Sequence, residues 1–225
     1  MGQAIGQALP FAIGVALSPM PIIAVVLMLS TPKGRVNGPA FLSGWVAGLA
    51  IVGAITLLVS SGASASNNGS PATWVSILKI VLGLLLLVLA VRQWRQRPRG
   101  DATPELPGWM KTIDTFTPVK SVGMAFLLSG INPKNLLLTV GAGAAIAQTG
   151  AGTTDQIVAL AVFVALATLG VGAPVGVYYA MGDRSARILD ELHEWMAREN
   201  VTIIAVLCLI IGAKLIGDAI SALAS

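Results

Sequence analysis

Six long apolar runs take up most of this chain and fix its class. They cover about residues 3–29, 38–60, 73–94, 119–147, 156–181 and 201–223. About 20 apolar residues suffice for a helix to cross a bilayer, and a span must be helical because lipid cannot satisfy backbone N–H and C=O groups. Only 11% of the residues are charged, against about 25% in soluble domains. The sequence therefore predicts an all-α integral membrane protein with six transmembrane helices, in a single membrane domain over residues 1–225.

The fourth apolar run is interrupted near its centre. Ser129-Gly130 ends one apolar stretch, and Asn132-Pro133-Lys134 begins the next. Gly130 favours a helix end because glycine adopts positive φ without a Cβ clash. Asn132 suits the capping position, and Pro133 suits the first turn of a new helix. We expect two half-helices here, the second presenting free N–H groups and a partial positive charge to the break.

The first apolar run contains a similar interruption. Ser18-Pro19-Met20-Pro21 lies near its middle, and Leu17-Ser18 matches Leu128-Ser129 at an offset of about 111 residues. Broken segments at corresponding places in two halves point to the binding site of a transporter. We therefore expect broken helices 1 and 4 to form one site at the bilayer midplane. The candidate substrate-binding residues are Ser18, Pro19, Pro21, Ser129, Gly130, Asn132, Pro133 and Lys134.

Positive charges between the spans are confined to alternate loops. Lys33 and Arg35 lie in the first loop, a run from Arg92 to Lys120 in the third, and Arg184, Arg187 and Arg198 in the fifth, whereas the other loops and both termini carry none. Positive loops face the cytoplasm, so we expect a bacterial cytoplasmic membrane protein with both termini outside. Three spans per half then invert the second half relative to the first. This layout gives repeat one at about 1–95, a basic loop at about 95–118, and repeat two at about 119–225, with an amphipathic interfacial helix at 183–200.

Four charged residues lie at membrane depth. A cation there is costly unless it is paired or serves a polar path, so Lys134 either binds substrate or tethers carbonyls released by the break. Lys214 and Asp218 share a helix face at spacing i, i+4 and form either an internal salt bridge or a proton-linked pair. Lys79 either reaches the outer membrane interface with its ammonium group or has a functional role with Lys214 and Asp218. We treat Lys79, Lys214 and Asp218 as possible coupling residues.

Several classes of function are disfavoured. Spans one to four hold no Asp or Glu, whereas hard cations need several oxygen ligands. The one cysteine, Cys208, excludes an intrachain disulfide. No catalytic constellation or phosphate-binding loop is present. The net charge of +4 follows from the topology and does not indicate nucleic acid. We expect no enzyme, metal or cofactor.

The break motifs resemble those of a known superfamily. Asn132-Pro133-Lys134, followed by Leu136-Leu137-Leu138, is similar to the signature in the second half of the LysE superfamily of transporters, and Ser18-Pro19-Met20-Pro21 resembles its Pro-rich first-span break. The resemblance covers essentially the whole chain. The basic central loop and Gly/Ala-rich spans look most like the GAP family of peptidoglycolipid or sulfolipid addressing proteins. That resemblance implies movement of glycolipids towards the cell surface, often beside a larger lipid exporter.

Departures from other branches narrow the choice of substrate. Gly48 is followed by Leu49, where amino-acid exporters of the superfamily tend to carry Asp. We therefore expect a transporter or flippase of a lipid or glycolipid, with membrane lipids as partners. The alternatives are a small-solute exporter for amino acids or organic anions, and a non-transporting scaffold for a larger lipid exporter. The small-residue pairs Gly44–Gly48 and Gly172–Gly176 suit close helix packing, and a homo-oligomer is compatible with them.

Overall fold

The computed structural model describes residues 1–62, 66–67, 70–71, 73–95 and 108–224. Apart from a two-stranded hairpin, the described chain is helical, as predicted. Half of the predicted basic loop, at 96–107, lies outside the described residues. The α-helices are α1 (Gly2–Ala16), α2 (Pro19–Leu29), α3 (Gly34–Gly62), α4 (Thr73–Arg95), α5 (Pro118–Gly130), α6 (Pro133–Gln148), α7 (Thr153–Met181) and α8 (Ser185–Ala224). Two 3₁₀ segments, η1 (Gly108–Thr115) and η2 (Gly182–Arg184), and the strands β1 (Ser66–Asn67) and β2 (Ser70–Pro71) complete the described elements.

Four described helices are long and apolar enough to cross a membrane: α3, α4, α7 and α8. Together, α1 and α2 make a fifth if the bent pair is counted as one span. The predicted fourth span, 119–147, corresponds to α5 and α6, which do not meet this criterion even as a pair. Its centre is occupied by Asn132-Pro133-Lys134-Asn135, which dilutes the apolar content. The count of six spans is therefore not confirmed by length and composition.

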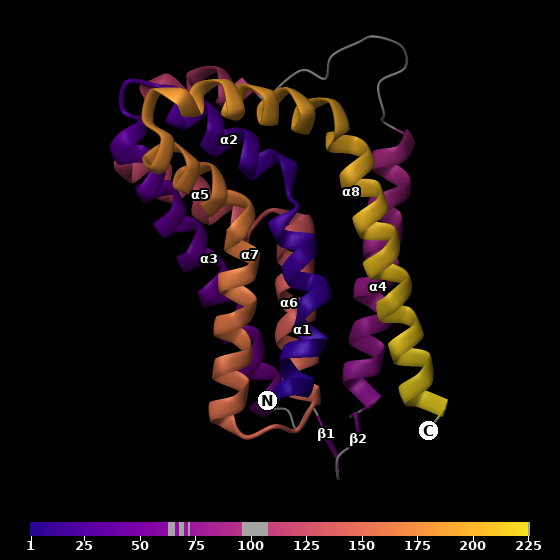
Figure 1. Cartoon of the computed structure of the whole chain (residues 1–225). Coiled ribbons are helices and arrows are strands. Elements are labelled where there is room, and N and C mark those ends of the chain that lie inside the picture. Colours follow the sequence, from indigo (N-terminus) through magenta and orange to yellow (C-terminus); the bar gives the residue numbers. More distant parts are fainter. Residues whose placement is uncertain (63–65, 68–69, 72, 96–107, 225) are drawn as a thin grey trace.

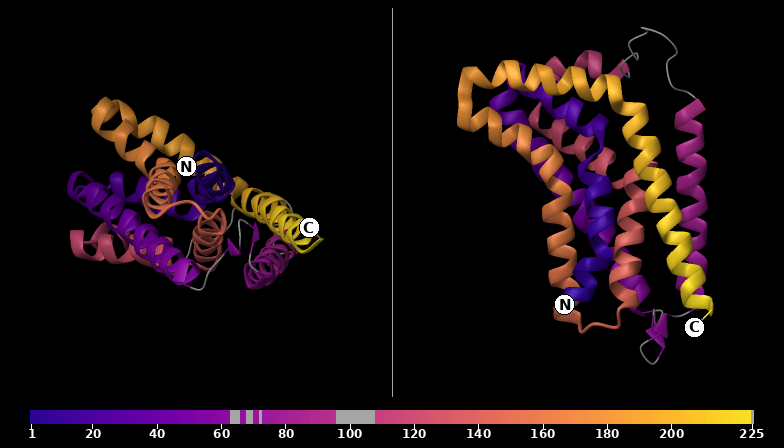
Figure 2. Two further views of the ribbon diagram at one scale, coloured as in Figure 1. Left: turned by 90° about the horizontal axis from the view of Figure 1, so that it is seen from below. Right: turned by 45° about the vertical axis from the view of Figure 1, so that its right-hand side comes forward.

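Both termini lie at one end of the bundle (Figure 1). At the opposite end, the first part of α8 crosses over the other helices and then turns to descend beside α4, as two views agree (Figure 2). The predicted interfacial segment 183–200 is therefore not a separate helix, because η2 leads into α8 and α8 continues unbroken to Ala224. Its apolar residues Leu189 and Met196 are buried against the bundle, which fixes its crossing.

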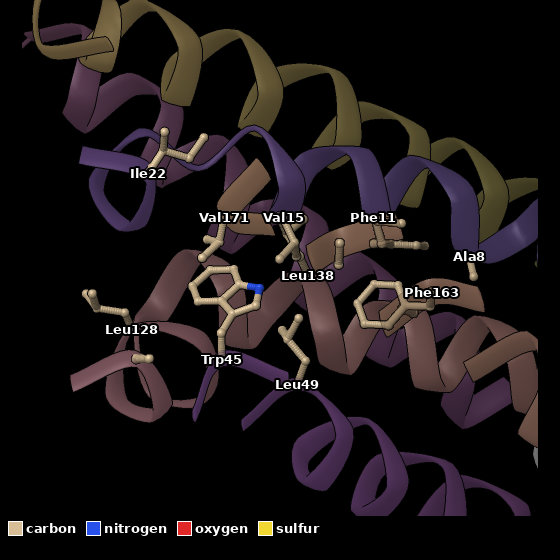
Figure 3. Close-up of a cluster of buried hydrophobic side chains, with 14 of the residues drawn as sticks. Ala8, Phe11, Val15, Ile22, Trp45, Leu49, Leu128, Leu138, Phe163 and Val171 are labelled. Carbon is tan, nitrogen blue, oxygen red and sulfur yellow. The ribbon is translucent and has the colours of Figure 1, made fainter. Parts of the chain in front are cut away.

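All eight α-helices contribute buried apolar residues to the core. Its largest fully buried side chains are Trp45, Phe11, Phe41 and Phe163. Figure 3 shows Trp45, Phe11 and Phe163 near Leu49 and Leu138. Glycine lets α6 approach α1 closely, because a Cβ on Gly141 would lie 2.6 Å from the Phe11 ring. Other faces of α3, α4 and α8 leave many large apolar side chains exposed, as expected for surfaces that face lipid.

The small-residue pairs behave differently in the two halves. Gly44 and Gly48 hold α3 against α5, because their added Cβ atoms would lie 2.2 Å from the Val122 carbonyl oxygen and 2.0 Å from Ser129 Oγ. Gly172 and Gly176 make no comparable approach, since a Cβ on Gly176 would meet nothing within 4 Å. The close contact of α7 is made instead by another glycine, Gly170, against the Ala16 carbonyl oxygen of α1.

Candidate functional site

The predicted breaks are present, and both new half-helices begin with proline. Between α1 and α2 the chain bends by 52°, with Ser18 at the N-cap and Pro19 in the first turn. Asn132 caps α6, where its Oδ1 accepts a hydrogen bond of 3.2 Å from the Lys134 amide, and Pro133 follows it. The capping role of Asn132 is thereby confirmed. Ser18 makes no side-chain cap bond to its own helix, so its hydroxyl is available elsewhere.

Gly130 does not act as predicted. It is the last residue of α5, and the only glycines with positive φ in the described chain are Gly150 and Gly182. A Cβ on Gly130 would lie 3.4 Å from Val52 Cγ2 and 3.6 Å from the Gly48 carbonyl oxygen. These are ordinary van der Waals distances. The expectation that Gly130 ends the helix through positive φ is wrong.

A buried hydrogen-bond network joins the two breaks. Lys134 Nζ donates to the Gly14 carbonyl oxygen at 2.8 Å and to Ser18 Oγ at 2.8 Å. Ser18 Oγ donates in turn to Asn135 Oδ1 at 2.7 Å. Asn135 Nδ2 donates to the Leu128 carbonyl oxygen at 2.9 Å. Ser18, Lys134 and Asn135 are 3%, 7% and 1% exposed, so the network is almost fully enclosed.

The network satisfies carbonyls that the breaks release. The Ser18 amide bonds to the Val15 carbonyl, so it does not take the Gly14 carbonyl four residues back. The Asn132 amide likewise bonds to the Leu127 carbonyl and leaves the carbonyl of Leu128. A buried carbonyl without a donor costs free energy. Lys134 and Asn135 supply the donors, and a cation at a helix C-terminus is further favoured by the helix dipole.

These contacts show which residues of the first half correspond in position to which residues of the second half. Pro19 and Pro133, the first-turn prolines, are 114 residues apart. The same offset pairs Gly14 with Leu128, whose carbonyls are both capped by side chains. The predicted match of Leu17-Ser18 with Leu128-Ser129 is therefore displaced by about three residues, and the partner of Ser18 is the other N-cap residue, Asn132.

A cavity of about 180 Å³ opens beside the network. Six of the eight predicted substrate-binding residues line it, namely Ser18, Pro19, Pro21, Asn132, Pro133 and Lys134. The other two do not: Ser129 Oγ donates to the Phe126 carbonyl at 3.2 Å and lies against Gly48, while Gly130 packs on α3. The lining is mixed, with prolines and apolar side chains as well as amide, hydroxyl and ammonium groups.

Five further residues line the cavity, and the sequence reasoning missed them: Met20, Leu89, Gln93, Asn135 and Ile204. Asn135 carried a signal, since a second polar residue beside Lys134 in an apolar run is unusual. Gln93 carried little, because it stands among Arg92 and Arg95 at the end of a span and reads as part of a basic loop. Its carboxamide adds a donor and an acceptor from α4.

The breaks lie off-centre along the bundle. α1 and α6, with 15 and 16 residues, run from the breaks to the end that carries both termini, and α2 and α5 lie towards the opposite end, where α8 crosses (Figure 1). Gln93 is two residues from the C-terminal end of α4. The site was predicted at the midplane. The cavity lies instead towards the end of the bundle that carries the basic loops.

The three possible coupling residues are brought together on the packed pair α4 and α8. Lys214 Nζ lies 2.5 Å from Asp218 Oδ2, and both side chains are 34% exposed. Lys79 is buried, and both Asp218 and Lys214 act on it electrostatically. The backbones cross closely nearby, since a Cβ on Gly83 would lie 2.8 Å from the Gly212 carbonyl oxygen. None of these residues lines the cavity at the breaks.

The family of the chain follows from comparison with known proteins. Among described residues, no group of three or more His, Cys, Asp or Glu side chains is placed to hold a metal ion. No curated protein and no solved structure matches the chain. The family model "Sap, sulfolipid-1-addressing protein" matches residues 8–221, a range that includes both breaks, the Lys134 network and the α4–α8 pair. This match confirms the resemblance to sulfolipid addressing proteins, and the chain belongs to the sulfolipid-1-addressing protein family.

Proposed function

We propose that this protein is a transporter, of flippase type and not an enzyme, that moves a lipid or glycolipid across the cytoplasmic membrane. The observation that carries the proposal is Lys134, a buried cation lining a cavity where two broken helices meet. The family name, which refers to the addressing of a sulfolipid, supports an amphiphile as substrate. A sulfated or phosphorylated headgroup is anionic and suits a cationic site.

The contacts leave Lys134 able to bind a ligand. An ammonium group has three N–H donors, and Gly14 and Ser18 accept two of them. The third would be free to bind a ligand in the cavity that Lys134 lines, beside the first turn of α6, whose dipole also favours negative charge. Tethering of a released carbonyl and headgroup capture are therefore compatible roles. Asn132 and Gln93 would contact hydroxyl groups of the same ligand.

The cavity sets a limit on what binds in this conformation. Its volume of about 180 Å³ equals roughly six water molecules at about 30 Å³ each. That space admits a headgroup fragment, not a whole glycolipid, so acyl tails would stay in the bilayer and the helices would have to separate during transport. Rocking of one repeat against the other would provide this separation.

We further propose six spans in two inverted repeats, as in the LysE superfamily. The packing supports this, because α3 lies on α5 as α7 lies on α1, and α2 contacts α8 as α6 contacts α4. If each helix is replaced by its counterpart in the other half, the α3–α5 contact becomes the α7–α1 contact. The α2–α8 contact likewise becomes the α6–α4 contact. Alternate basic loops support cytoplasmic placement of the end where α8 crosses, with both termini outside.

An ion gradient coupled through Lys79, Lys214 and Asp218 is part of the proposal. Asp218→Asn removes the partner of Lys214 at membrane depth, where an unpaired cation is costly, so thermal unfolding of the variant is measured beside its transport. Transport driven by an imposed proton gradient in proteoliposomes should then fall at least about 10-fold. Undiminished transport by the variant would remove the coupling role and leave the site at the breaks unaffected.

The test of the main proposal is native mass spectrometry of the full chain in detergent, wild type beside Lys134→Met. Lys120→Met is the matched control, because Lys120 is an exposed lysine at the start of α5 outside the cavity. Wild type and the control should retain an anionic lipid or glycolipid that Lys134→Met loses. Equal retention by all three proteins would contradict headgroup capture at the breaks.

One observation favours a second candidate, a small-solute exporter. The cavity is closer in size to an amino acid or small organic anion than to a glycolipid headgroup. Export assays with radiolabelled solutes in proteoliposomes separate the two, since solute export without lipid retention would favour the alternative. Assembly with a larger lipid exporter, or with further copies of this chain, is compatible with either function and is measured by pull-down from native membranes.

A further inference from the structure

A second, larger cavity lies at the other end of α2. Its volume is about 750 Å³, and it is bounded by the last turn of α2, the start of α3, the end of α7 and the start of α8. Its polar lining includes Ser30, Thr31, Arg35, Tyr178, Tyr179 and Asp190. It is thus about four times the size of the cavity at the breaks, and it lies at the end of the bundle where α8 crosses (Figure 1).

Three hydroxyl groups of this cavity donate their O–H to backbone carbonyls, so towards a ligand they can only accept hydrogen bonds. Ser30 Oγ donates to the Val26 carbonyl at 3.2 Å, and Thr31 Oγ1 donates to the Met28 carbonyl at 2.7 Å. The Tyr179 hydroxyl donates to the Arg35 carbonyl. Each of these groups has used its one O–H on the backbone and keeps lone pairs. They therefore suit a ligand rich in donors, such as the hydroxyls of a sugar.

Arg35 gives the cavity an available cation. Its side chain is exposed, and no hydrogen bond or salt bridge joins its guanidinium group to another described residue. Arginine binds sulfate and phosphate through paired N–H donors in a fixed fork. Asp190 supplies a carboxylate that accepts from sugar hydroxyls, so the lining favours a hydroxyl-rich group with one anionic substituent over a bare anion.

Apolar surface completes the recognition. The rings of Tyr178 and Tyr179 meet edge to face, with centroids 5.6 Å apart, and provide rigid apolar faces with polar tips. Such faces suit the C–H surface of a sugar ring. Three large apolar residues directly neighbour lining residues in the sequence: Val36, Met181 and Ile188. Their exposed fractions are 60%, 41% and 43%. Acyl tails attached to a sugar in the cavity would lie on this apolar rim.

We propose that this cavity is a receiving site for a sugar headgroup that bears a sulfate or phosphate, from which the headgroup passes to the breaks. The inference rests on the proposed lipid transport and names a second site for it. α2 connects the two sites, with Leu29 in the larger cavity and Pro19 in the smaller one. Its 11 residues separate them by about 16 Å at 1.5 Å per residue.

The test is calorimetric titration of the full-length protein in detergent micelles with glucose 6-sulfate, beside glucose and inorganic sulfate. Arg35→Gln should weaken binding of glucose 6-sulfate at least about 10-fold, because a charge-assisted pair is lost. Arg184→Gln removes a nearby exposed arginine that does not line the cavity, and it should leave the affinity within about twofold. Ala186→Phe, which fills the cavity without changing charge, should weaken binding as well, with folding checked by thermal unfolding.

Lys134→Met distinguishes this site from the one at the breaks. If that variant binds glucose 6-sulfate as wild type does and Arg35→Gln does not, the second site is supported even where lipid retention at the breaks has failed. If Lys134→Met loses the sugar and Arg35→Gln keeps it, the sugar binds only at the breaks and the inference is overturned. Nanodiscs with sulfated galactosylceramide separate a lipid-borne ligand from a soluble one. The inference would also be overturned if the wild-type protein bound neither glucose 6-sulfate nor sulfated galactosylceramide.

Discussion

The two helix breaks share a geometry and differ in chemistry. Each new half-helix starts with proline in its first turn, and each preceding half-helix leaves one carbonyl to be capped from outside its own ladder. At an offset of 114 residues, however, Met20 stands opposite Lys134 and Pro21 opposite Asn135. The first break is therefore apolar where the second is polar.

This difference places both side chains that cap the released carbonyls in the second half. Lys134 and Asn135 cap the released carbonyls of both halves, whereas the first break offers only the Gly14 carbonyl and the Ser18 hydroxyl. A symmetric pair of lysines would place two unpaired cations in one small cavity, at high desolvation cost. The asymmetry teaches that two breaks of similar backbone geometry can differ in chemistry through the residues at two positions, Met20 and Pro21 against Lys134 and Asn135.

The largest effect should come from replacing Lys134, which donates two hydrogen bonds across the breaks. Lys134→Met leaves the Gly14 carbonyl without a partner and removes the cavity's cation. Hydrogen bonds to charged groups contribute about 1.5–3 kcal/mol each, so we expect the free energy of unfolding to fall by about 3 kcal/mol and lipid retention to be lost. Unfolding in mixed micelles measures the first effect. An effect below that of Lys120→Met would contradict the network's role.

Asn135→Leu should have the next largest effect. The variant removes the donor to the Leu128 carbonyl and the acceptor of the Ser18 hydroxyl. An unsatisfied buried group costs about 1–3 kcal/mol, which predicts a loss of about 2 kcal/mol. Lys134 keeps its bond to Gly14 and its charge, so lipid retention should persist. Loss of retention at full stability would show instead that Asn135 contacts the ligand.

The helix contacts beside the two breaks provide a third comparison. Gly170→Ala places a Cβ 1.8 Å from the Ala16 carbonyl oxygen, and Gly44→Ala places one 2.2 Å from the Val122 carbonyl oxygen. Both variants should lose about 1–2 kcal/mol, since overpacking forces the backbones apart. Gly176→Ala meets nothing within 4 Å and is the matched control. Equal thermal unfolding of all three variants would contradict these helix contacts.

Local features of the site could be predicted from the sequence. Asn132 and Pro133 act through neighbours within a few residues, so their capping and first-turn roles follow from residue type alone. The backbone of Gly130 could not be predicted in the same way. Its residue type favours a positive φ, but α5 ends there without one.

Contacts between the halves were out of reach of the sequence. Ser18 meets Asn135 across 117 residues, and no periodicity encodes which hydroxyl reaches which amide. Gln93 joins the site because α4 packs beside α6 and α8, and its sequence neighbours indicate only a basic helix end. The off-centre position of the breaks depends on the tilt of α2 and α5, which hydropathy does not record.

Ser18→Ala should cost less than either change in the second half. Lys134 keeps the Gly14 carbonyl, and Asn135 keeps the Leu128 carbonyl, so no backbone carbonyl loses its donor. The bond from the Lys134 ammonium and the bond to Asn135 Oδ1 are lost, at about 1.5 kcal/mol together. Ser43→Ala, which removes an exposed hydroxyl bonded to its own helix, is the control. Combined with Asn135→Leu, the loss should be smaller than the sum, because the two residues share a bond. A strictly additive double variant would contradict that shared bond.

The smallest effect should be that of the prolines, and it should be equal at both breaks. Pro19 and Pro133 each occupy a first turn, where the missing N–H costs nothing, so alanine preserves the backbone hydrogen bonds. Replacement chiefly restores freedom to the unfolded chain, at about 0.4–1 kcal/mol. Pro19→Ala and Pro133→Ala should therefore unfold within about 0.5 kcal/mol of each other and retain lipid as wild type does. A selective loss of lipid in Pro133→Ala alone would mean that the second break contributes its ring as well as its charge to the ligand, and that the two breaks differ even in their framework.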